Sequence, residues 1–193
     1  MTELLPLFLK LEGRRVLVVG GGPVALGRVR QLAATRAELV VVAPEVVPEL
    51  PALASAVHRR PFQPSDLDGA WLAVAAATPA VNRAVKQEAE ARRLFVNAID
   101  DPPSASAYAA GVIRRGGVTV AVSTDGRAPA LAGLLREGIA ALLPEETEAW
   151  VERAEALRQQ WRQQSVPMNQ RRPLLLKVLE QLYAERKEQE EAR

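Results

Sequence analysis

The first hundred residues alternate between short apolar runs and longer segments of mixed polarity. Residues 16–19 are apolar without interruption, which is typical of a parallel strand covered on both faces. The same pattern predicts further strands at 38–43, 70–76 and 94–99, and a short strand is expected around 57–60 in a less regular segment. Strands in this rhythm, with helices between them, predict an α/β fold with a Rossmann-like, doubly wound parallel sheet.

Two helices are expected to connect these strands. The first should follow the glycines at 20–22 and end near Ala34. The second should begin at Pro79, with Thr78 as its N-cap, and end near Arg93, because proline favours the first helical position and threonine the capping position.

The pattern changes after Asp100. Residues 110–122 are two apolar runs around a glycine turn, which predicts a β-hairpin. Three helices should follow, opened by Pro129, Pro144 and Pro173 in turn. Apolar residues recur at helical spacing in the last two, which predicts core or dimer contacts; they are Trp150, Ala154, Leu157, Trp161, Leu175, Val178, Leu179 and Leu182.

These changes divide the chain into three parts. We expect a Rossmann domain at 1–109, a small α+β dimerisation region at 110–144 and a C-terminal helical region at 145–193. The dimerisation role comes from the resemblance described below. The charged residues 185–193 are expected to form a solvated helix end.

Composition excludes several functions. The net charge of +2 argues against nucleic acid as the main partner. The chain has no cysteine and a single histidine, His58, so cysteine chemistry and a multi-histidine metal site within one chain are excluded. No apolar run is long enough to span a membrane, and the N-terminus lacks the basic region of a signal peptide. A cytoplasmic protein is expected.

The glycine turn carries the strongest functional signal. Gly20, Gly22 and Ala25 give the spacing G-x-G-x-x-A between a strand and a helix, the dinucleotide-binding fingerprint. Within it, Gly21, Pro23 and Val24 complete the predicted cofactor contacts. The alternative is a glycine turn that binds nothing.

The end of the second predicted strand bears on whether the cofactor is NAD or NADP, but its residues match the usual pattern only in part. An acidic residue is expected at its end to bind the adenosine ribose, and here Pro44 and Glu45 follow it. No arginine stands at the strand end for a 2′-phosphate. The sequence therefore favours NAD over NADP.

Asp100 is the best candidate for acid–base chemistry. It follows the last predicted strand of the sheet, and the glycine turn and Thr78 also follow strands. Ligands of such sheets bind beyond the carboxyl ends of the strands, so these residues should line one crevice. The alternative is a turn or capping carboxylate, the role we expect for Asp101.

The loop after the predicted hairpin offers groups for an anionic ligand. Ser123 and Thr124 carry hydroxyls there, although ordinary helix capping explains them equally well. Nearby arginines suit carboxylate binding or are simply solvated; they are Arg114, Arg115, Arg127 and Arg136. His58 has no partner motif and is expected to be structural or exposed.

The order and spacing of several motifs resemble the N-terminal region of siroheme synthases, the precorrin-2 dehydrogenase and sirohydrochlorin ferrochelatase family. The resemblance extends over essentially the whole chain. The matching segments are LPLFL at 5–9, VVGGGPVA at 18–25, VAPE at 42–45, AAAT at 75–78 with Asn82, FVNAIDDP at 95–102, VAVSTDGRAPALA at 120–132 and LLRE at 134–137.

The family implies a homodimer that uses NAD to oxidise precorrin-2 to sirohydrochlorin, and some members then insert ferrous iron as a second substrate. Asp100 would be the acid–base residue. Cofactor contacts would extend to Thr78 and Asn82. The tetrapyrrole would contact Asn97, Ser123, Thr124, Arg114 and Arg127. Two other functions stay open, an NAD-sensing regulatory module without catalysis and a chelatase that keeps the fold as a scaffold.

Overall fold

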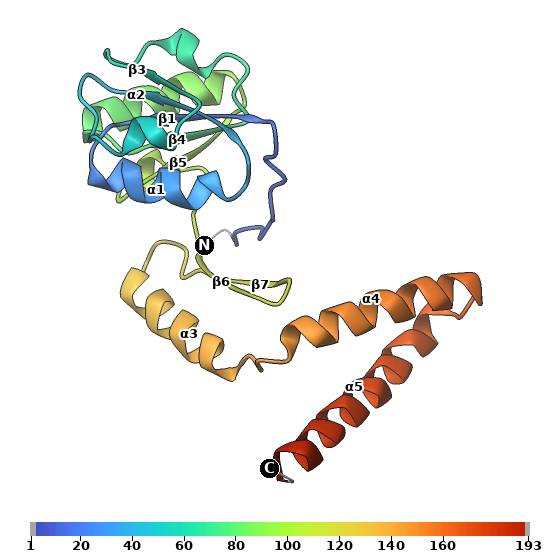
Figure 1. Ribbon diagram of the computed structural model, residues 1–193. Helices are drawn as coiled ribbons and strands as arrows, with labels where there is room; N and C mark the ends of the chain where they lie inside the picture. Colours follow the sequence, from blue (N-terminus) through green and yellow to red (C-terminus); the bar gives the residue numbers. More distant parts are fainter. Residues whose placement is uncertain (1–2, 192–193) are drawn as a thin grey trace. The chain divides into compact units, whose positions relative to one another are not determined.

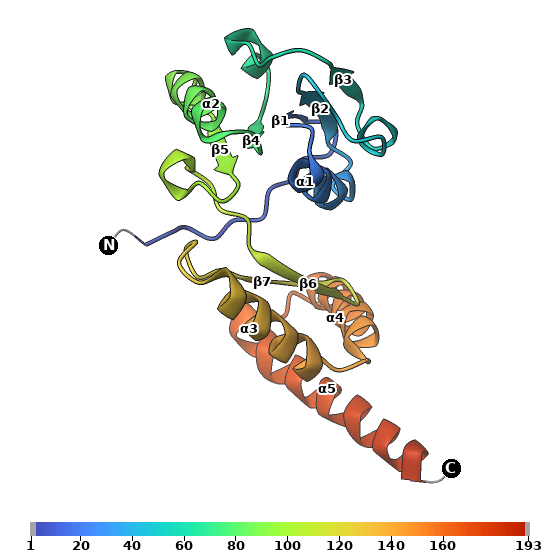
Figure 2. The ribbon, with the colours of Figure 1, turned by 90° about the vertical axis from the view of Figure 1, so that its left-hand side faces the viewer.

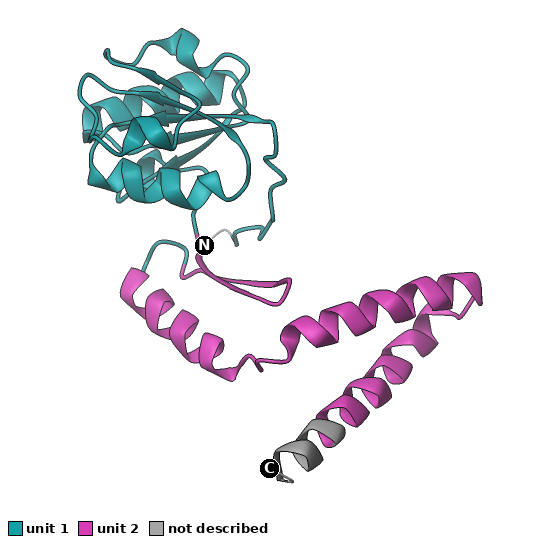
Figure 3. Cartoon of the chain, in the orientation of Figure 1, with its two compact units in different colours: residues 1–109, 125–127 teal, residues 110–124, 128–193 magenta. Residues whose placement is uncertain are grey.

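The structure is a computed structural model that describes residues 3–191, with side chains described as far as residue 184 (Figure 1). The chain forms two compact units (Figure 3). One holds residues up to 109 together with Asp125–Arg127, and the other holds Ala110–Thr124 together with the chain from Ala128 onward. The three-part division expected from the sequence stays a prediction.

The first unit is built on a five-stranded parallel sheet with the strand order β3-β2-β1-β4-β5. Its strands are β1 (Arg15–Val19), β2 (Glu38–Val42), β3 (Ala56–His58), β4 (Leu72–Ala75) and β5 (Phe95–Ala98). Its helices are α1 (Pro23–Ala33) and α2 (Pro79–Ala91), with the 3₁₀ turns η1 (Leu50–Ala52), η2 (Pro64–Leu67) and η3 (Pro102–Ser104). The Rossmann-like sheet expected from the apolar runs is confirmed.

One helix covers each face of this sheet (Figure 2). Successive residues of a strand point to opposite faces, and β1 shows the consequence. Val18 packs in the same core as Val29 of α1, whereas Leu17 packs in the core that contains Val85 of α2. All four side chains are fully buried. The sheet is therefore doubly wound, and its carboxyl edge carries the loops that lead into both helices.

The second unit combines a hairpin with three helices. The hairpin pairs β6 (Gly111–Arg115) with β7 (Val118–Val122), and α3 (Pro129–Leu142), α4 (Thr147–Gln163) and α5 (Met168–Glu191) follow. Leu157 and Trp161 of the predicted stripe on α4 are buried. No described helix is long and apolar enough to cross a membrane. The charged stretch 185–193 lies outside the described side chains.

Two predicted helix starts were wrong. Pro144 does not open a helix: its carbonyl accepts hydrogen bonds from the amide and hydroxyl of Thr147 at 3.3 and 2.5 Å, which closes a turn ahead of α4. Pro173 lies inside α5, which begins directly after Pro167. A proline in the second turn removes only one intrahelical hydrogen bond, so the helix continues through it.

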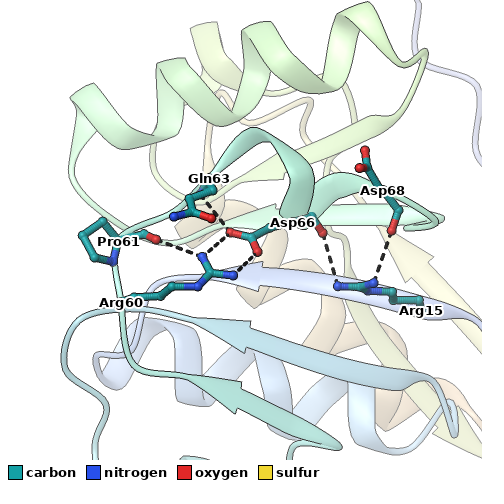
Figure 4. Close-up of polar contacts among 6 residues, drawn as sticks. All are labelled: Arg15, Arg60, Pro61, Gln63, Asp66 and Asp68. Atoms are coloured by element: carbon teal, nitrogen blue, oxygen red, sulfur yellow. Dashed lines mark hydrogen bonds and ion pairs between the residues drawn. The ribbon is translucent and has the colours of Figure 1, made fainter.

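An ion pair between the half-buried Arg60 and the buried Asp66 holds the segment between β3 and β4 in place (Figure 4). The guanidinium of Arg60 donates to both carboxylate oxygens of Asp66, at 2.8 and 2.5 Å. The amide of Gln63 also donates to this carboxylate, at 2.8 Å. Arg15 of β1 bonds the Asp66 carbonyl at 3.4 Å, which ties the η2 turn to the central strand.

We expect Asp66→Asn to lower the free energy of unfolding by about 2 kcal/mol at pH 7, because the hydrogen bonds from Arg60 and Gln63 to the charged carboxylate are lost. The hydrogen bonds from Arg60 hold the pKa of Asp66 below its usual value. The stabilisation is therefore complete above the unfolded-state pKa of about 4 and is lost as the pH falls through the lower folded pKa.

Urea unfolding of both proteins at pH 7 and at pH 3 measures this difference. The gap between wild type and Asp66→Asn should narrow at pH 3. Asp68→Asn is the matched control, since the Asp68 side chain is 67% exposed and its ion pair with Arg92 contributes little. An equal loss in both variants would contradict the special role of Asp66.

Candidate functional site

The glycine turn lies at the carboxyl end of the central strand, where the order of strands reverses. Gly20 has φ +129°, and a Cβ there would collide with the carbonyl of Ala76 after β4. Its amide donates to Val42 of β2 at 3.0 Å. Gly20 therefore holds the turn tightly between the two neighbouring strands, which only glycine allows.

Gly21 packs against the loop that follows β2. A Cβ there would collide with the carbonyl of Glu45, and the amide of Val47 donates to the Gly21 carbonyl at 2.8 Å. Pro44 and Glu45 are themselves exposed. The structure thus brings the predicted ribose-binding residue next to the predicted pyrophosphate-binding turn.

Gly22 differs from the other two glycines because no heavy atom lies within 4 Å of the position of its Cβ. It is the N-cap of α1, with no capping side chain and no acidic residue in the first turn. Pro23 is at the first helical position, Val24 is exposed and Ala25 is fully buried against the sheet. Open space before an uncapped helix N-terminus fits the pyrophosphate of a nicotinamide dinucleotide.

The loop after β4 presents a second helix N-terminus. Thr78 is the N-cap of α2, is exposed and makes no capping hydrogen bond with its side chain. Asn82, one turn further, is 2% exposed, and its side-chain oxygen accepts the amide of Ala77 at 3.1 Å. Thr78 is thus open to a ligand, whereas Asn82 holds the shape of the loop.

Asp100 lies two residues beyond β5, at the same edge of the sheet as the glycine turn. The amide of Ile99 continues the ladder by donating to Ala75 at 2.9 Å. Asp100 itself has φ +55° and is exposed. This left-handed conformation, which aspartate tolerates better than most residues, turns the chain sharply after the strand. The carboxylate is left where it can reach a ligand.

The segment after Asp100 is held to β5 by side chains. Asn97 is 9% exposed, and its side-chain nitrogen donates to the carbonyl of Ala107 at 3.0 Å. The hydroxyl of Ser106 accepts the amide of Val96 at 2.9 Å. Asn97 therefore supports the loop that carries Asp100, and its predicted contact with the substrate stays a prediction.

The other predicted substrate residues are divided between the two units. Arg127 is exposed and belongs to the first unit, because its loop packs through Gly126 against Tyr108 and Pro102. Arg114, Ser123 and Thr124 belong to the second unit. The Thr124 hydroxyl accepts the amide of Ala128 at 3.2 Å, ahead of α3.

The remaining residues considered from sequence have ordinary surroundings. Arg115 donates to the Leu143 carbonyl, and Arg136 pairs with Glu137 at 3.0 Å. His58 is exposed at the end of β3. Among the described side chains, no group of three or more histidines or acids could hold a metal ion.

Arg28 is not among the site residues predicted from the sequence, where it stood out only as a departure from the family, whose members often carry a basic pair at positions 27 and 28. This residue lies on α1, and its half-buried guanidinium is within electrostatic range of Asp100. Burial lowers the pKa of Arg28, and the charge of Asp100 acts in the opposite direction. The available signal was a cation three residues after Ala25 and next to Val29, which lies on the buried face of the helix.

A doubly wound parallel sheet with an open glycine turn at its switch point defines the class of NAD(P)-binding proteins. A family model described as "Putative NAD(P)-binding" matches residues 7–110, and one described as "Sirohaem biosynthesis protein central" matches residues 115–142. The chain belongs to the siroheme synthase N-terminal region family, as its motifs predict.

The chain is similar to curated proteins named siroheme synthase. It is 41% identical to siroheme synthase 3 of Aeromonas hydrophila over 88% of this chain and 37% of that protein. It is 46% identical to siroheme synthase of Pseudomonas entomophila over 74% of this chain and 32% of that protein. The chain therefore spans about a third of the length of these relatives.

A solved structure matches nearly the whole chain. The precorrin-2 dehydrogenase SirC superposes with a TM-score of 0.71 and 26% sequence identity, over 91% of this chain and 89% of that one. This share of the chain exceeds the first unit, so the likeness extends into the second unit.

Proposed function

We propose that this protein is an NAD-dependent dehydrogenase that oxidises precorrin-2 to sirohydrochlorin in siroheme biosynthesis. The observation that carries the proposal is the placement of an exposed carboxylate, Asp100, at the same sheet edge as the open glycine turn. The likeness to SirC, which extends over 91% of the chain, supports the same substrate class.

The first unit would hold the cofactor through backbone groups. The turn at 20–22 and the first amides of α1 would bind the pyrophosphate, while Glu45 and Thr78 lie on the loops to either side. When bound, the nicotinamide accepts the hydride that the macrocycle releases. Because no acid stands in the first turn of α1, its N-terminal dipole is available to the cofactor's phosphates.

Asp100 would complete the oxidation by taking a proton. Precorrin-2 loses a hydride and a proton when it becomes sirohydrochlorin, so a base must stand beside the macrocycle. An exposed carboxylate on a loop held by Asn97 and Ser106 meets this need, because its position is fixed while its oxygens remain accessible. Arg127, Arg114, Ser123, Thr124 and Asn97 remain proposed contacts for the substrate.

The direct test is anaerobic incubation of the purified protein with precorrin-2 and NAD, followed by absorption spectroscopy. Sirohydrochlorin should form at a rate proportional to enzyme concentration. Ferrous iron added afterwards is a second substrate, and siroheme formation above the uncatalysed rate would assign a ferrochelatase activity. An enzyme that only metallates sirohydrochlorin is a chelatase on an inherited fold. A protein that binds NAD and catalyses neither step is a sensor.

We propose NAD rather than NADP as the cofactor. The carbonyl of Glu45 packs on Gly21, so its exposed carboxylate stands beside the pyrophosphate turn. A second phosphate on the ribose would meet this negative charge. Glu45→Gln is expected to improve kcat/KM with NADP relative to NAD by about tenfold, which corresponds to about 1.4 kcal/mol.

Steady-state kinetics with both cofactors measures this ratio. Glu49→Gln is the matched control, because Glu49 is an exposed acid four residues further along the same loop. Its ratio should equal that of the wild type. If Glu45→Gln leaves the ratio unchanged as well, another residue sets the preference.

We also propose that the protein is a homodimer. Helix α3 has no buried residue, although most of its side chains are apolar. Leu134 and Leu142 are 67% and 82% exposed, and large exposed apolar surfaces mark interaction sites. A second copy of this helix supplies a matching apolar face. Light scattering of the purified protein should therefore give twice the mass of one chain.

A further inference from the structure

Arg28 is a partly buried cation with few partners. Its side chain is half-buried on α1, and its Nε is fully buried with no hydrogen-bond acceptor among the described residues. Nη1 donates to the neutral side chain of Gln31 at 2.6 Å. In the described part of the chain no carboxylate lies within ion-pair distance of it. Such a cation is costly to bury and calls for an anion.

The charge that acts on Arg28 is that of Asp100. The two groups interact electrostatically without forming an ion pair. Core packing explains their proximity, because Ile99 packs on the same cluster as Leu26 and Val29 of α1. The residues on either side of Arg28 thus share a core with the residue that precedes Asp100.

The charge balance at this edge is unfavourable for an acidic ligand without Arg28. Asp100 and Asp101 follow one another directly, and Oδ2 of Asp101 is buried without a hydrogen-bond partner. A polyanionic substrate that approaches Asp100 would meet these negative charges. The Arg28 guanidinium, which interacts with Asp100, offsets part of this repulsion and offers N–H groups in the geometry that suits a carboxylate.

We propose that Arg28 binds a carboxylate of the polyanionic tetrapyrrole and thereby holds the reacting part of the macrocycle beside Asp100. This inference rests on the proposed function, because it takes the ligand to be precorrin-2 or its product. It assigns Arg28 a direct contact with the substrate, whereas the cofactor is bound by the glycine turn at the start of the same helix.

The test compares Arg28→Gln and Arg28→Lys with Arg30→Gln, which removes an exposed arginine from the same helix. Sirohydrochlorin affinity is measured by equilibrium dialysis, NAD affinity by calorimetry, and kcat and KM for precorrin-2 by absorption. Arg28→Gln should weaken sirohydrochlorin binding and raise the precorrin-2 KM by about tenfold or more. Arg28→Lys should lie between Arg28→Gln and wild type, and Arg30→Gln should match wild type.

Binding of NAD and the melting temperature distinguish this role from a structural one. The NAD affinity of Arg28→Gln should equal that of wild type, and its melting temperature should be equal or higher because a poorly paired buried charge is removed. Unchanged sirohydrochlorin affinity in Arg28→Gln would overturn the inference while the proposed function stands. Equal losses in Arg28→Lys and Arg28→Gln, with NAD affinity lost as well, would also overturn it. A wild-type protein that neither oxidises precorrin-2 nor binds sirohydrochlorin overturns both.

Discussion

Asp100→Asn is expected to reduce the oxidation of precorrin-2 by about 10²- to 10⁴-fold while NAD still binds with wild-type affinity. The reduction is the usual contribution of a positioned general base. Asparagine is the appropriate replacement because Asp100 has φ +55°, a conformation that asparagine tolerates and alanine does not. The change therefore removes the charge and leaves the turn after β5 in place.

Stopped-flow absorption at saturating NAD measures the chemical step, and calorimetry measures cofactor binding. Asp101→Asn is the control, since it removes the neighbouring carboxylate. The backbone carbonyl of residue 101, which closes the η3 turn by accepting the amide of Ser104 at 2.9 Å, is kept. This variant should retain turnover within a few-fold of wild type. If Asp101→Asn loses as much activity as Asp100→Asn, or if Asp100→Asn remains fully active, the proton acceptor has been misassigned.

Gly22→Asp should lower NAD affinity by about 100-fold or more and leave the folded protein at least as stable as wild type. A carboxylate at this position would stand where the pyrophosphate is expected, and two like charges in contact cost several kcal/mol. The backbone of Gly22 is extended, with φ −84°, and no atom lies within 4 Å of the Cβ position. An aspartate there would also cap α1, a gain of about 0.5–1 kcal/mol.

The neighbouring glycine supplies the contrast. Gly20→Ala should lower the free energy of unfolding by about 2 kcal/mol, because φ is +129° and the methyl group would meet the Ala76 carbonyl. Calorimetric titration with NAD and thermal unfolding separate the two effects. Gly22→Ser should cap the helix without adding charge and should bind NAD better than Gly22→Asp. Wild-type NAD affinity in Gly22→Asp would show that the pyrophosphate lies elsewhere.

Both predictions concern one edge of one sheet, yet they test different requirements. Asp100 supplies a group that reacts, and its removal should leave binding intact. Gly22 supplies empty space and free amides, and filling that space should prevent binding before any chemistry occurs. If Asp100→Asn stays active while Gly22→Asp loses NAD affinity, the cofactor binds as proposed and another residue is the base. If Gly22→Asp keeps its NAD affinity while Asp100→Asn loses activity, Asp100 is the base and the cofactor binds in a different place.

Local sequence determined much of the fold. The apolar runs predicted four of the five parallel strands, because the apolar residues of a strand that is buried on both faces identify it without any other part of the chain. The fifth strand, β3, was predicted from the weaker pattern of residues 57–60. The glycine turn, the proline-opened α2 and the hairpin were likewise predicted, since each depends on conformations of a few adjacent residues. The same local signals placed Gly22 and Asp100 at strand ends, and hence at the carboxyl edge of the sheet.

Tertiary structure decided what those local signals left open. Gly20 and Gly21 pack against other loops while Gly22 faces open space, a difference created by residues far along the chain. The side-chain amides of Asn82 and Asn97 bond to backbone groups that folding brings to them. Pro173 was predicted to begin a helix because proline favours the first helical position, but it lies inside α5.

The surroundings of the charged side chains were the hardest feature to predict from the sequence. Arg60 and Asp66 look like ordinary surface residues in the sequence, and only the packing of η2 over β1 makes Asp66 a buried ion-pair partner. Arg28 becomes a half-buried cation within electrostatic range of Asp100 because two distant segments share one core. Burial and electrostatic environment depend on non-local contacts, which the order of residues along the chain does not reveal.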